Sequence, residues 1–217
     1  MGGASRVKLS EDVRSGRVIF VSHCILNQNS KVYGIAYRPA AITEVVNYIL
    51  KNNIGIVQMP CPESTYWGLR RWAMLKEQYD VPRFREYCRE LAREVANQVV
   101  EYLRSGYVVA AIIGCDGSPV CGVNWTNTYV SGQWGGFITE ETFRNPPKQK
   151  LVKGMGVFME ELSRELRSRG VEVPIIGYPE MKELGGIDEF MKVLERVVKE
   201  ALRREPRASP TNYQRSG

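Results

Sequence analysis

Short apolar runs alternate with longer amphipathic stretches along this chain, and this alternation constrains the fold more than any other feature of the sequence. The apolar runs, which predict strands, are residues 17–22, 54–59, 107–113 and 173–178. The amphipathic stretches, which predict helices, are residues 39–52, 82–105, 156–169 and 188–204. Strands separated by long helices are typical of βαβ units, whose right-handed crossovers build a parallel sheet with helices on both faces. We therefore expect an α/β fold.

The chain has 217 residues, of which 43% are hydrophobic and 25% charged, so it can bury one substantial core. We expect a single α/β domain over residues 17–204, a Rossmann-like three-layer sandwich around a mainly parallel sheet of four or five strands. Residues 1–16 precede the first predicted strand as an N-terminal extension. Residues 205–217 are rich in Pro, Ser and Arg and lack periodicity, so we expect a flexible C-terminal tail.

Cysteine count and hydropathy exclude several classes of protein. Five cysteines are too sparse, and odd in number, for a secreted disulfide framework. No apolar stretch approaches the roughly 18 residues of a membrane span, and the first residues lack the apolar core of a signal peptide. We therefore expect a soluble, cytoplasmic protein whose thiols are reduced and able to bind metal or to react.

The chain carries a modest excess of positive charge. Thirty Lys and Arg residues against 24 Asp and Glu give a net charge of +6 and a pI near 9.1. Both signs are mixed along the predicted helices, as on solvated helix faces. The excess is typical of a soluble protein with a basic surface, and an anionic ligand or an RNA partner is the alternative.

Four of the five cysteines follow predicted strands. Cys24 comes after the first strand, Cys61 after the second, and Cys115 and Cys121 after the third. In an open α/β sheet, ligands bind outside the carboxyl ends of the strands, and parallel strands place those ends at one edge. We therefore expect these thiols to meet there. Cys88 lies instead on the apolar face of the longest predicted helix, where we expect a small core residue.

Several chemistries could use such a group of thiols. A disulfide is disfavoured in a reducing compartment, and the close Cys-x-x-Cys pairs of structural zinc sites are absent, although zinc held by widely spaced ligands stays open. A cysteine nucleophile needs a base. The single histidine, His23, is expected to point away from Cys24 in an extended segment, but it could serve Cys115. An iron–sulfur cluster held by thiolates needs no histidine.

Two short motifs surround these cysteines. Cys61-Pro62-Glu63 places a carboxylate two residues after one thiol, and Ser118-Pro119-Val120-Cys121-Gly122 places a hydroxyl three residues before another. Proline stiffens each turn, and glycine lets the backbone approach a bulky ligand. Both motifs lie in long loops, residues 61–81 and 115–152, and long loops in a compact domain are more often functional than accidental. We interpret Asp116-Gly117 as turn chemistry.

At these residues the chain resembles the DUF523 family, which includes proteins of the thiouracil desulfidase (TudS-like) type. That family has a cysteine after the first strand, Cys-Pro-Glu after the second and Ser-Pro-x-Cys-Gly after the third. Here Cys24, residues 61–63 and residues 118–122 stand at those places, over a resemblance that covers residues 17–180. Gly154-Met155-Gly156-Val157 and Tyr178-Pro179-Glu180 are also similar.

The resemblance implies a [4Fe–4S] cluster bound by Cys24, Cys61 and Cys121, whose fourth iron has no protein ligand. It also implies that Glu63 and Ser118 are catalytic and manage the protons. The implied reaction is non-redox cleavage of a C–S bond. A thiolated small molecule, such as a thiouracil, would bind the open iron through its sulfur and would lose that sulfur as sulfide.

Cys115 is not part of the family pattern. We interpret it either as a buried thiol at the end of a strand or as an auxiliary group, a spare ligand or sulfur acceptor beside the cluster. His23 is a second auxiliary candidate.

All four tryptophans, residues 67, 72, 125 and 134, lie in the two long loops and outside the predicted helices and strands. We expect Trp67, Trp125 and Trp134 to stack a planar thiolated base at the mouth of the pocket, with Arg70 or Arg71 adding a cation–π contact or binding an anion. A thionucleobase, its nucleoside, or a tRNA- or RNA-derived substrate is therefore expected.

Two other functions are open at this point. One is a cysteine-nucleophile hydrolase or amidotransferase-like enzyme that uses Cys115 or Cys121. The other is a zinc-binding or nucleic-acid-binding module without catalysis.

Overall fold

A computed structural model of the protein describes residues 12–132 and 135–207. Its central sheet is formed by β1 (Arg17–Ser22), β2 (Gly55–Met59), β3 (Val108–Asp116) and β6 (Ile175–Pro179). The strands lie in the order β2-β1-β3-β6, and every neighbouring pair is parallel. The predicted α/β fold with a mainly parallel sheet is therefore confirmed, with four strands that are all parallel.

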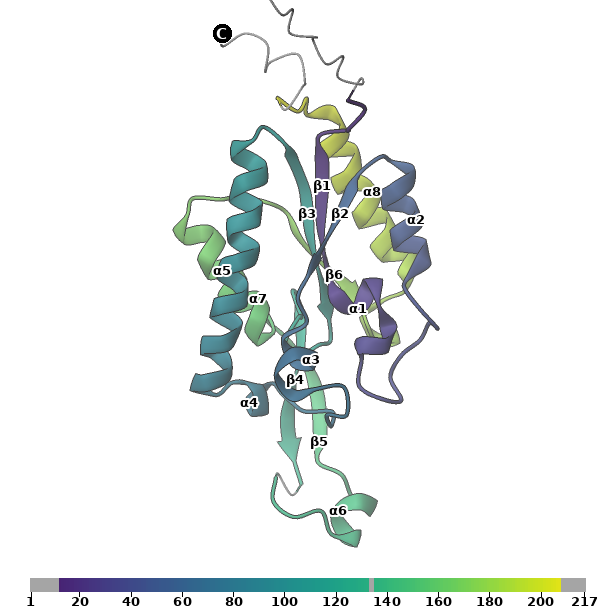
Figure 1. Ribbon diagram of the computed structural model, residues 1–217. Coiled ribbons are helices and arrows are strands. Elements are labelled where there is room, and N and C mark those ends of the chain that lie inside the picture. The colour runs from purple at the N-terminus through teal and green to yellow at the C-terminus, as the bar shows by residue number, and fades with distance from the viewer. Residues whose placement is uncertain (1–11, 133–134, 208–217) are drawn as a thin grey trace, which may run out of the picture.

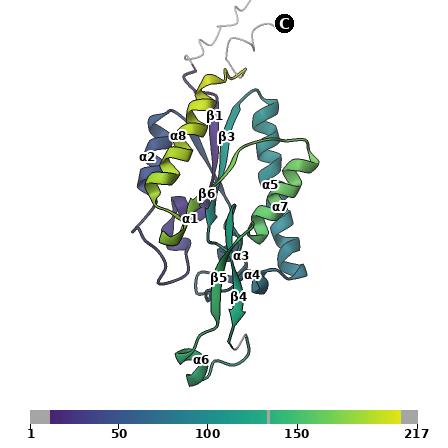
Figure 2. The ribbon, with the colours of Figure 1, turned by 180° about the vertical axis from the view of Figure 1, so that it is seen from behind.

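Helices cover both faces of this sheet. α2 (Thr43–Lys51) and α8 (Ile187–Arg203) lie on one face, while α5 (Pro82–Arg104) and α7 (Val157–Ser168) lie on the other, as Figure 1 shows. Figure 2 shows the same two layers from behind. The apolar spacing of the sequence predicts each of these helices, and the predicted ends differ from the observed ends by at most four residues.

The strand order places the switch point of this sheet between β1 and β3, where doubly wound folds have a crevice. The chain runs from β1 through α2 to β2, and then through α5 to β3 on the other side of β1. Because these two connections move in opposite directions along the sheet, their helices lie on opposite faces and separate at the carboxyl ends of β1 and β3. Ligands of doubly wound sheets bind at this position.

The core lies on both sides of β3, which is buried along its whole length. The apolar stripe of α5, which includes Phe84, Val95 and Val99, belongs to the same core. Cys88 lies in this stripe and is fully buried, and burial raises the pKa of its thiol to about 12. The prediction that Cys88 is a core residue is therefore confirmed.

The two predicted long loops contain regular structure. The first holds α3 (Pro62–Trp67) and α4 (Lys76–Tyr79); the second holds α6 (Glu140–Arg144) and an antiparallel hairpin of β4 (Trp125–Ser131) and β5 (Lys148–Lys153). The prediction of irregular loops is therefore wrong. Of the β4 side chains, only Thr126 is buried, so no apolar periodicity marks the hairpin in the sequence. In Figure 1 the hairpin projects beyond the carboxyl ends of the sheet strands.

Short helical turns follow β1 and β6. α1 (His23–Leu26) and η1 (Gln28–Ser30) come after β1, and η2 (Lys182–Leu184) comes after β6. His23 and Cys24 therefore lie in a helical turn. The expectation that they occupy an extended segment is wrong, because β1 ends at Ser22 and the chain turns there.

Most of the predicted N-terminal extension (1–16) and C-terminal tail (205–217) lies outside the described residues. At the described end of α8, the guanidinium of Arg17 donates to the carbonyls of Ala201 at 3.3 Å and Arg204 at 3.0 Å, which ties this helix to the start of β1. Within residues 12–132 and 135–207, the helices are too short or too polar to cross a membrane.

Candidate functional site

The carboxyl ends of three neighbouring strands carry the cysteines. Cys24 is in α1, directly after β1, and Cys61 lies between β2 and α3. Cys115 is inside β3, where it pairs with Tyr178 of β6, so the prediction that it follows the third strand is wrong. The strand is longer than predicted because β6 continues to pair with it beyond its apolar run. Cys121 lies in the loop after β3.

These four thiols, which we call the cysteine group, interact with one another. A side-chain hydrogen bond with Cys24, together with burial, raises the pKa of Cys115. Burial raises the pKa of Cys121, and the charges of Cys24 and Cys61 raise it further. Burial also raises the pKa of Cys61, with a smaller contribution from Cys24. The structure therefore brings together the cysteines that the sequence places far apart.

The donor set of the cysteine group bears on which metal centre it could hold. In the described part of the chain, no three or more His, Cys, Asp or Glu side chains are arranged to hold one metal ion. A cubane cluster has a different requirement, because each cysteine binds a different iron atom and the sulfurs lie further apart than around one ion. All donors of the cysteine group are thiols, which are the usual protein ligands of such clusters.

Asp116 fixes the loop at residues 117–124, which carries the last cysteine. Its Oδ1 accepts the backbone N–H groups of Val123 and Asn124, each at 2.8 Å, and its Oδ2 accepts the side-chain amide of Asn124 at 2.9 Å. Gly177 leaves room for this carboxylate, because a Cβ at that position would lie 2.2 Å from Oδ2. Asp116 is therefore a structural residue of this loop, but it belongs to the end of β3 and its contacts are not those of a local turn.

The same loop caps the N-terminus of α7. The first turn of a helix leaves four N–H groups without partners inside the helix. Here the N–H groups of residues 156–159 donate to the carbonyls of Pro119, Val120 and Gly122 at 2.9–3.3 Å. Gly156 comes this close because it has no Cβ, which would lie 2.4 Å from the carbonyl carbon of Val120. The cysteine-bearing loop is therefore held by a helix of the core.

Ser118 is a structural residue of this loop. Its side chain is buried, and its Oγ accepts the backbone N–H groups of Val120 at 3.2 Å and Cys121 at 3.0 Å. In both contacts the Oγ is the acceptor, so the hydroxyl proton is not used by them and can be donated elsewhere. The predicted catalytic role of Ser118 stays a prediction, and in that role the hydroxyl would act as a hydrogen-bond donor.

Glu63 is held beside Cys61 by two polar side chains. Its Oε2 accepts from Nε of Arg71 at 3.0 Å and from the hydroxyl of Tyr79 at 3.1 Å. Arg71 also donates to the carbonyl of Ser30 at 2.8 Å, and its side chain is only 4% exposed. Burial raises the pKa of Glu63 above its ordinary value, although Arg71 opposes the rise. Both contacts use Oε2, which leaves Oε1 for water or substrate.

A second buried ion pair lies beside the cysteine group. The ammonium of Lys31 contacts the carboxylate of Glu180, and the two side chains are 5% and 14% exposed. The charges of Cys115 and Cys24 act on Lys31, which places the pair next to these thiols. Sequence reasoning found Glu180 only as part of a similar motif and did not predict its pairing with Lys31, because no local pattern joins two residues so far apart in the chain.

The predicted substrate-binding residues lie in different environments. Trp67 ends α3 and is 45% exposed, and Trp125 begins β4, so the prediction that they lie outside regular elements is wrong. Arg70 is exposed, whereas the side chain of its neighbour Arg71 is buried against the carboxylate of Glu63. Trp134 lies outside the described residues. A role of these side chains in substrate binding stays a prediction.

His23 is partly buried, and burial lowers the pKa of its imidazole. Among the hydrogen bonds of the described residues, none joins His23 to a cysteine. The raised pKa values of the buried thiols also disfavour a thiolate nucleophile, which needs a lowered pKa. The arrangement therefore gives little support to a cysteine hydrolase.

A cavity of about 430 Å³ lies between α4 and the hairpin, and no cysteine lines it. Two of its charged residues already have partners, because Lys76 pairs with Glu160 at 2.5 Å and Asp80 pairs with Arg85. We therefore assign the candidate site to the cysteine group and its two carboxylates.

Comparison with known proteins identifies one similar chain. The uncharacterized protein MJ0003 of Methanocaldococcus jannaschii is 32% identical over 187 residues, which cover 86% of the present chain and the whole of that protein. No protein-family model matches the chain, and no solved structure matches it. The resemblance to DUF523 proteins therefore rests on the motifs themselves.

Substitution of Gly156 by alanine should separate the cysteine-bearing loop from α7. The new Cβ would collide with backbone, so we expect Gly156→Ala to lower the free energy of unfolding by about 1–3 kcal/mol. Cys121 should also react faster with iodoacetamide. Urea denaturation and mass-spectrometric mapping of labelled thiols measure both effects.

Gly55→Ala is the matched control, because its Cβ would approach no atom closer than 3.5 Å. It should leave the labelling rate of Cys121 unchanged. Equal labelling rates in the two variants would show that the contact with α7 does not hold the loop.

Proposed function

The chain belongs to the same family as the uncharacterized protein MJ0003, and, since the name of that relative states no activity, we propose from the site itself that the protein is an iron–sulfur-dependent desulfidase. One observation carries this proposal: three neighbouring parallel strands deliver Cys24, Cys61 and Cys121 to one crevice, with Glu63 beside them. The proposed substrate is a thiolated small molecule, similar to thiouracil or another thionucleobase.

Cys24, Cys61 and Cys121 are the proposed ligands of a [4Fe–4S] cluster. When bound, it would supply one iron without a protein ligand, a Lewis acid with affinity for a thiocarbonyl sulfur. Cys61 caps α3, where its Sγ accepts the N–H of Ser64 at 3.4 Å, and Cys24 and Cys61 keep part of their surface open. Cys115 is proposed as an auxiliary thiol, through its hydrogen bond with Cys24.

Glu63 is proposed to handle the protons of the reaction. Arg71 and Tyr79 hold Oε2, so Oε1 has a fixed position from which it can take a proton from water. Water adds to the thiocarbonyl carbon, the C–S bond breaks, and the products are a carbonyl and hydrogen sulfide, with no net oxidation or reduction. The hydroxyl proton of Ser118, which its contacts with the loop do not use, is available to the substrate.

Removal of any proposed ligand should prevent cluster binding. Anaerobically prepared wild-type protein should contain about four iron and four sulfide per chain and absorb visible light. Cys24→Ala, Cys61→Ala and Cys121→Ala should each lose most of this iron, as measured by elemental analysis.

Cys88→Ala is the control, because Cys88 lies in the core away from the crevice, and it should keep its iron. A wild-type protein that takes up zinc but no iron under anaerobic reconstitution would contradict the proposal.

Glu63→Gln should keep the cluster and lose activity. Because the amide cannot accept a proton from water, release of sulfide from thiouracil should fall by about 10²–10⁴-fold. Iron content and visible absorbance should match the wild type. Glu86→Gln, an exposed carboxylate on α5, is the control and should be fully active. Undiminished sulfide release by Glu63→Gln would rule out its proposed role.

RNA binding is a second candidate function, and the distribution of charge favours it. The described residues of three segments, 31–40, 67–76, and 125–132 with 135–153, lie at the cysteine end of the molecule in Figure 1. Together they hold nine Lys and Arg and two Glu. The rest of the chain then holds 21 Lys and Arg against 22 Asp and Glu. Three of the nine cations, Lys31, Arg71 and Lys76, pair with carboxylates outside these segments, whereas Lys148 and Lys150 of β5 are exposed.

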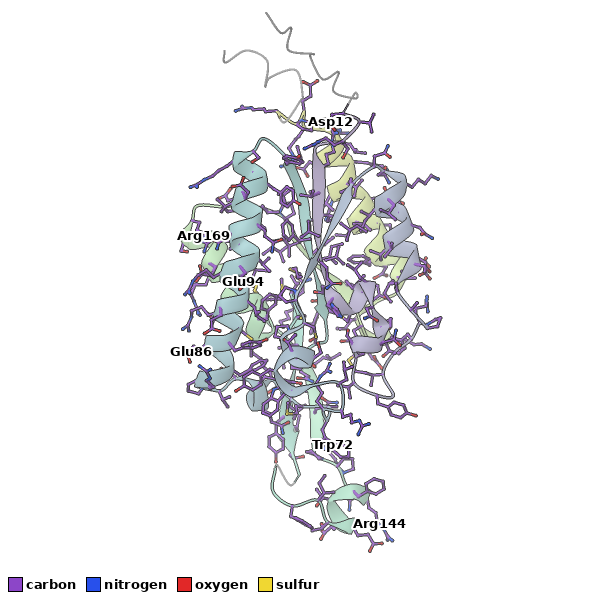
Figure 3. All side chains as sticks on the ribbon, viewed as in Figure 1. Asp12, Trp72, Glu86, Glu94, Arg144 and Arg169 are labelled. Carbon is purple, nitrogen blue, oxygen red and sulfur yellow. The ribbon has the colours of Figure 1, made fainter. Side chains whose placement is uncertain are left out.

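Exposed aromatic rings lie on the same segments. They are Tyr33, Tyr37, Trp67, Trp72, Phe137 and Phe143. Figure 3 shows Trp72 and Arg144 at this end of the molecule. Aromatic faces stack nucleic-acid bases, while Lys and Arg contact phosphates. A thiolated base within a tRNA or another RNA would fit this combination.

The double variant Lys148→Gln and Lys150→Gln should weaken single-stranded RNA binding, because both side chains are exposed on β5. The slope of log affinity against log salt should fall in magnitude by about one to two. Lys192→Gln with Lys199→Gln on α8 is the matched control and should keep the wild-type slope. Equal slopes for all three proteins would contradict an RNA site on the hairpin.

A further inference from the structure

The ion pair of Lys31 and Glu180 has no role in the reaction described above, although it lies beside the cysteine group. Its side chains are 5% and 14% exposed. Removing two charges from water is costly, and an apolar pair of similar size would join these two segments as well or better. A purely structural link would not need these charges, so the polarity of the pair points to a ligand.

The pair belongs to the same crevice as the thiols. Glu180 directly follows β6, which pairs with the part of β3 that contains Cys115, and the N–H of Glu180 donates to the carbonyl of Asp116 at 3.0 Å. The negative charge of Glu180 also acts on Glu63. A small molecule bound between the cysteine group and Glu63 would therefore lie within reach of Lys31 and Glu180.

Both members of the pair keep hydrogen-bonding capacity. The ammonium of Lys31 has three N–H donors; it contacts Oε1 of Glu180 and lies 4.8 Å from the ring centroid of Tyr37. These two contacts leave one donor. The ion pair uses Oε1 of Glu180, which leaves Oε2 as an acceptor. The pair therefore presents a donor directly next to an acceptor.

We propose that Lys31 and Glu180 are specificity residues that bind the N–H/C=O edge of a cyclic amide, with Glu180 accepting from the ring N–H and Lys31 donating to the adjacent carbonyl. This inference rests on the proposed desulfidase function and names the feature of the substrate that the site selects. Thiolated pyrimidinones carry such an edge close to their thiocarbonyl. A ring without the N–H leaves the carboxylate unpaired, and sites with buried polar groups reject such ligands strongly.

Calorimetric titration of the anaerobically prepared wild-type protein with uracil and with 1,3-dimethyluracil tests the proposal. The two probes keep the same carbonyls, but only uracil has ring N–H groups. The wild type should bind uracil at least about tenfold more tightly. Glu180→Gln should reduce this preference at least about threefold, because a neutral acceptor makes a weaker hydrogen bond than a carboxylate. Glu183→Gln, an exposed neighbour on η2, should keep the wild-type preference.

Lys31→Gln gives an independent measurement if the Glu180 variant does not fold. Because both probes keep their carbonyls, their affinities should fall by similar factors while the preference for uracil stays the same. Iron content should match the wild type in every variant, since neither residue is a proposed ligand.

The inference is overturned if wild-type protein binds the two probes equally or does not bind uracil. It is also overturned if Glu180→Gln keeps the full preference, even in a protein that releases sulfide from thiouracil. If the preferences follow expectation and no sulfide is released, the binding pair is supported and the desulfidase proposal fails.

Discussion

The four strands of the sheet run in one direction, and the candidate site depends on this constraint. Parallel strands place their carboxyl ends at the same edge, so segments far apart in the chain meet there. β2 delivers Cys61 and Glu63, β1 delivers Cys24, β3 leads to Cys121, and β6 ends beside Glu180. An antiparallel neighbour would carry its terminal residues to the opposite edge, away from the crevice.

The environment of the thiols combines rigid backbone with buried charge. Asp116 and the N-terminus of α7 fix the loop after β3. Asp116 accepts hydrogen bonds from backbone N–H groups of the loop, and the first N–H groups of α7 donate to carbonyls of the same loop. Two carboxylates then stand near the thiols, each paired with one cation: Glu63 with Arg71, and Glu180 with Lys31. Fixed polar groups of this kind hold a ligand without reorganisation, which is the property that both proposals above use.

Much of the fold could be predicted because its signals are local. Every helix that covers the sheet has apolar residues at helical spacing, and the sheet strands are short apolar runs. The hairpin was not predicted because its strands bury almost no side chains, so their sequence lacks an apolar alternation. The choice between Arg70 and Arg71 was not predicted either. Both are arginines, and only the folded chain shows that Arg71 is the one that contacts Glu63.

The sequence by itself determined the parallel α/β architecture, the burial of Cys88 and the positions of Cys24, Cys61 and Cys121 after strands, because hydrophobic periodicity acts over a few neighbouring residues. Only the tertiary structure decided which groups meet. The pairing of Lys31 with Glu180 and the capping of α7 by the cysteine-bearing loop join distant segments. Such contacts arise from the packing of the whole chain, and no local pattern of residues encodes them.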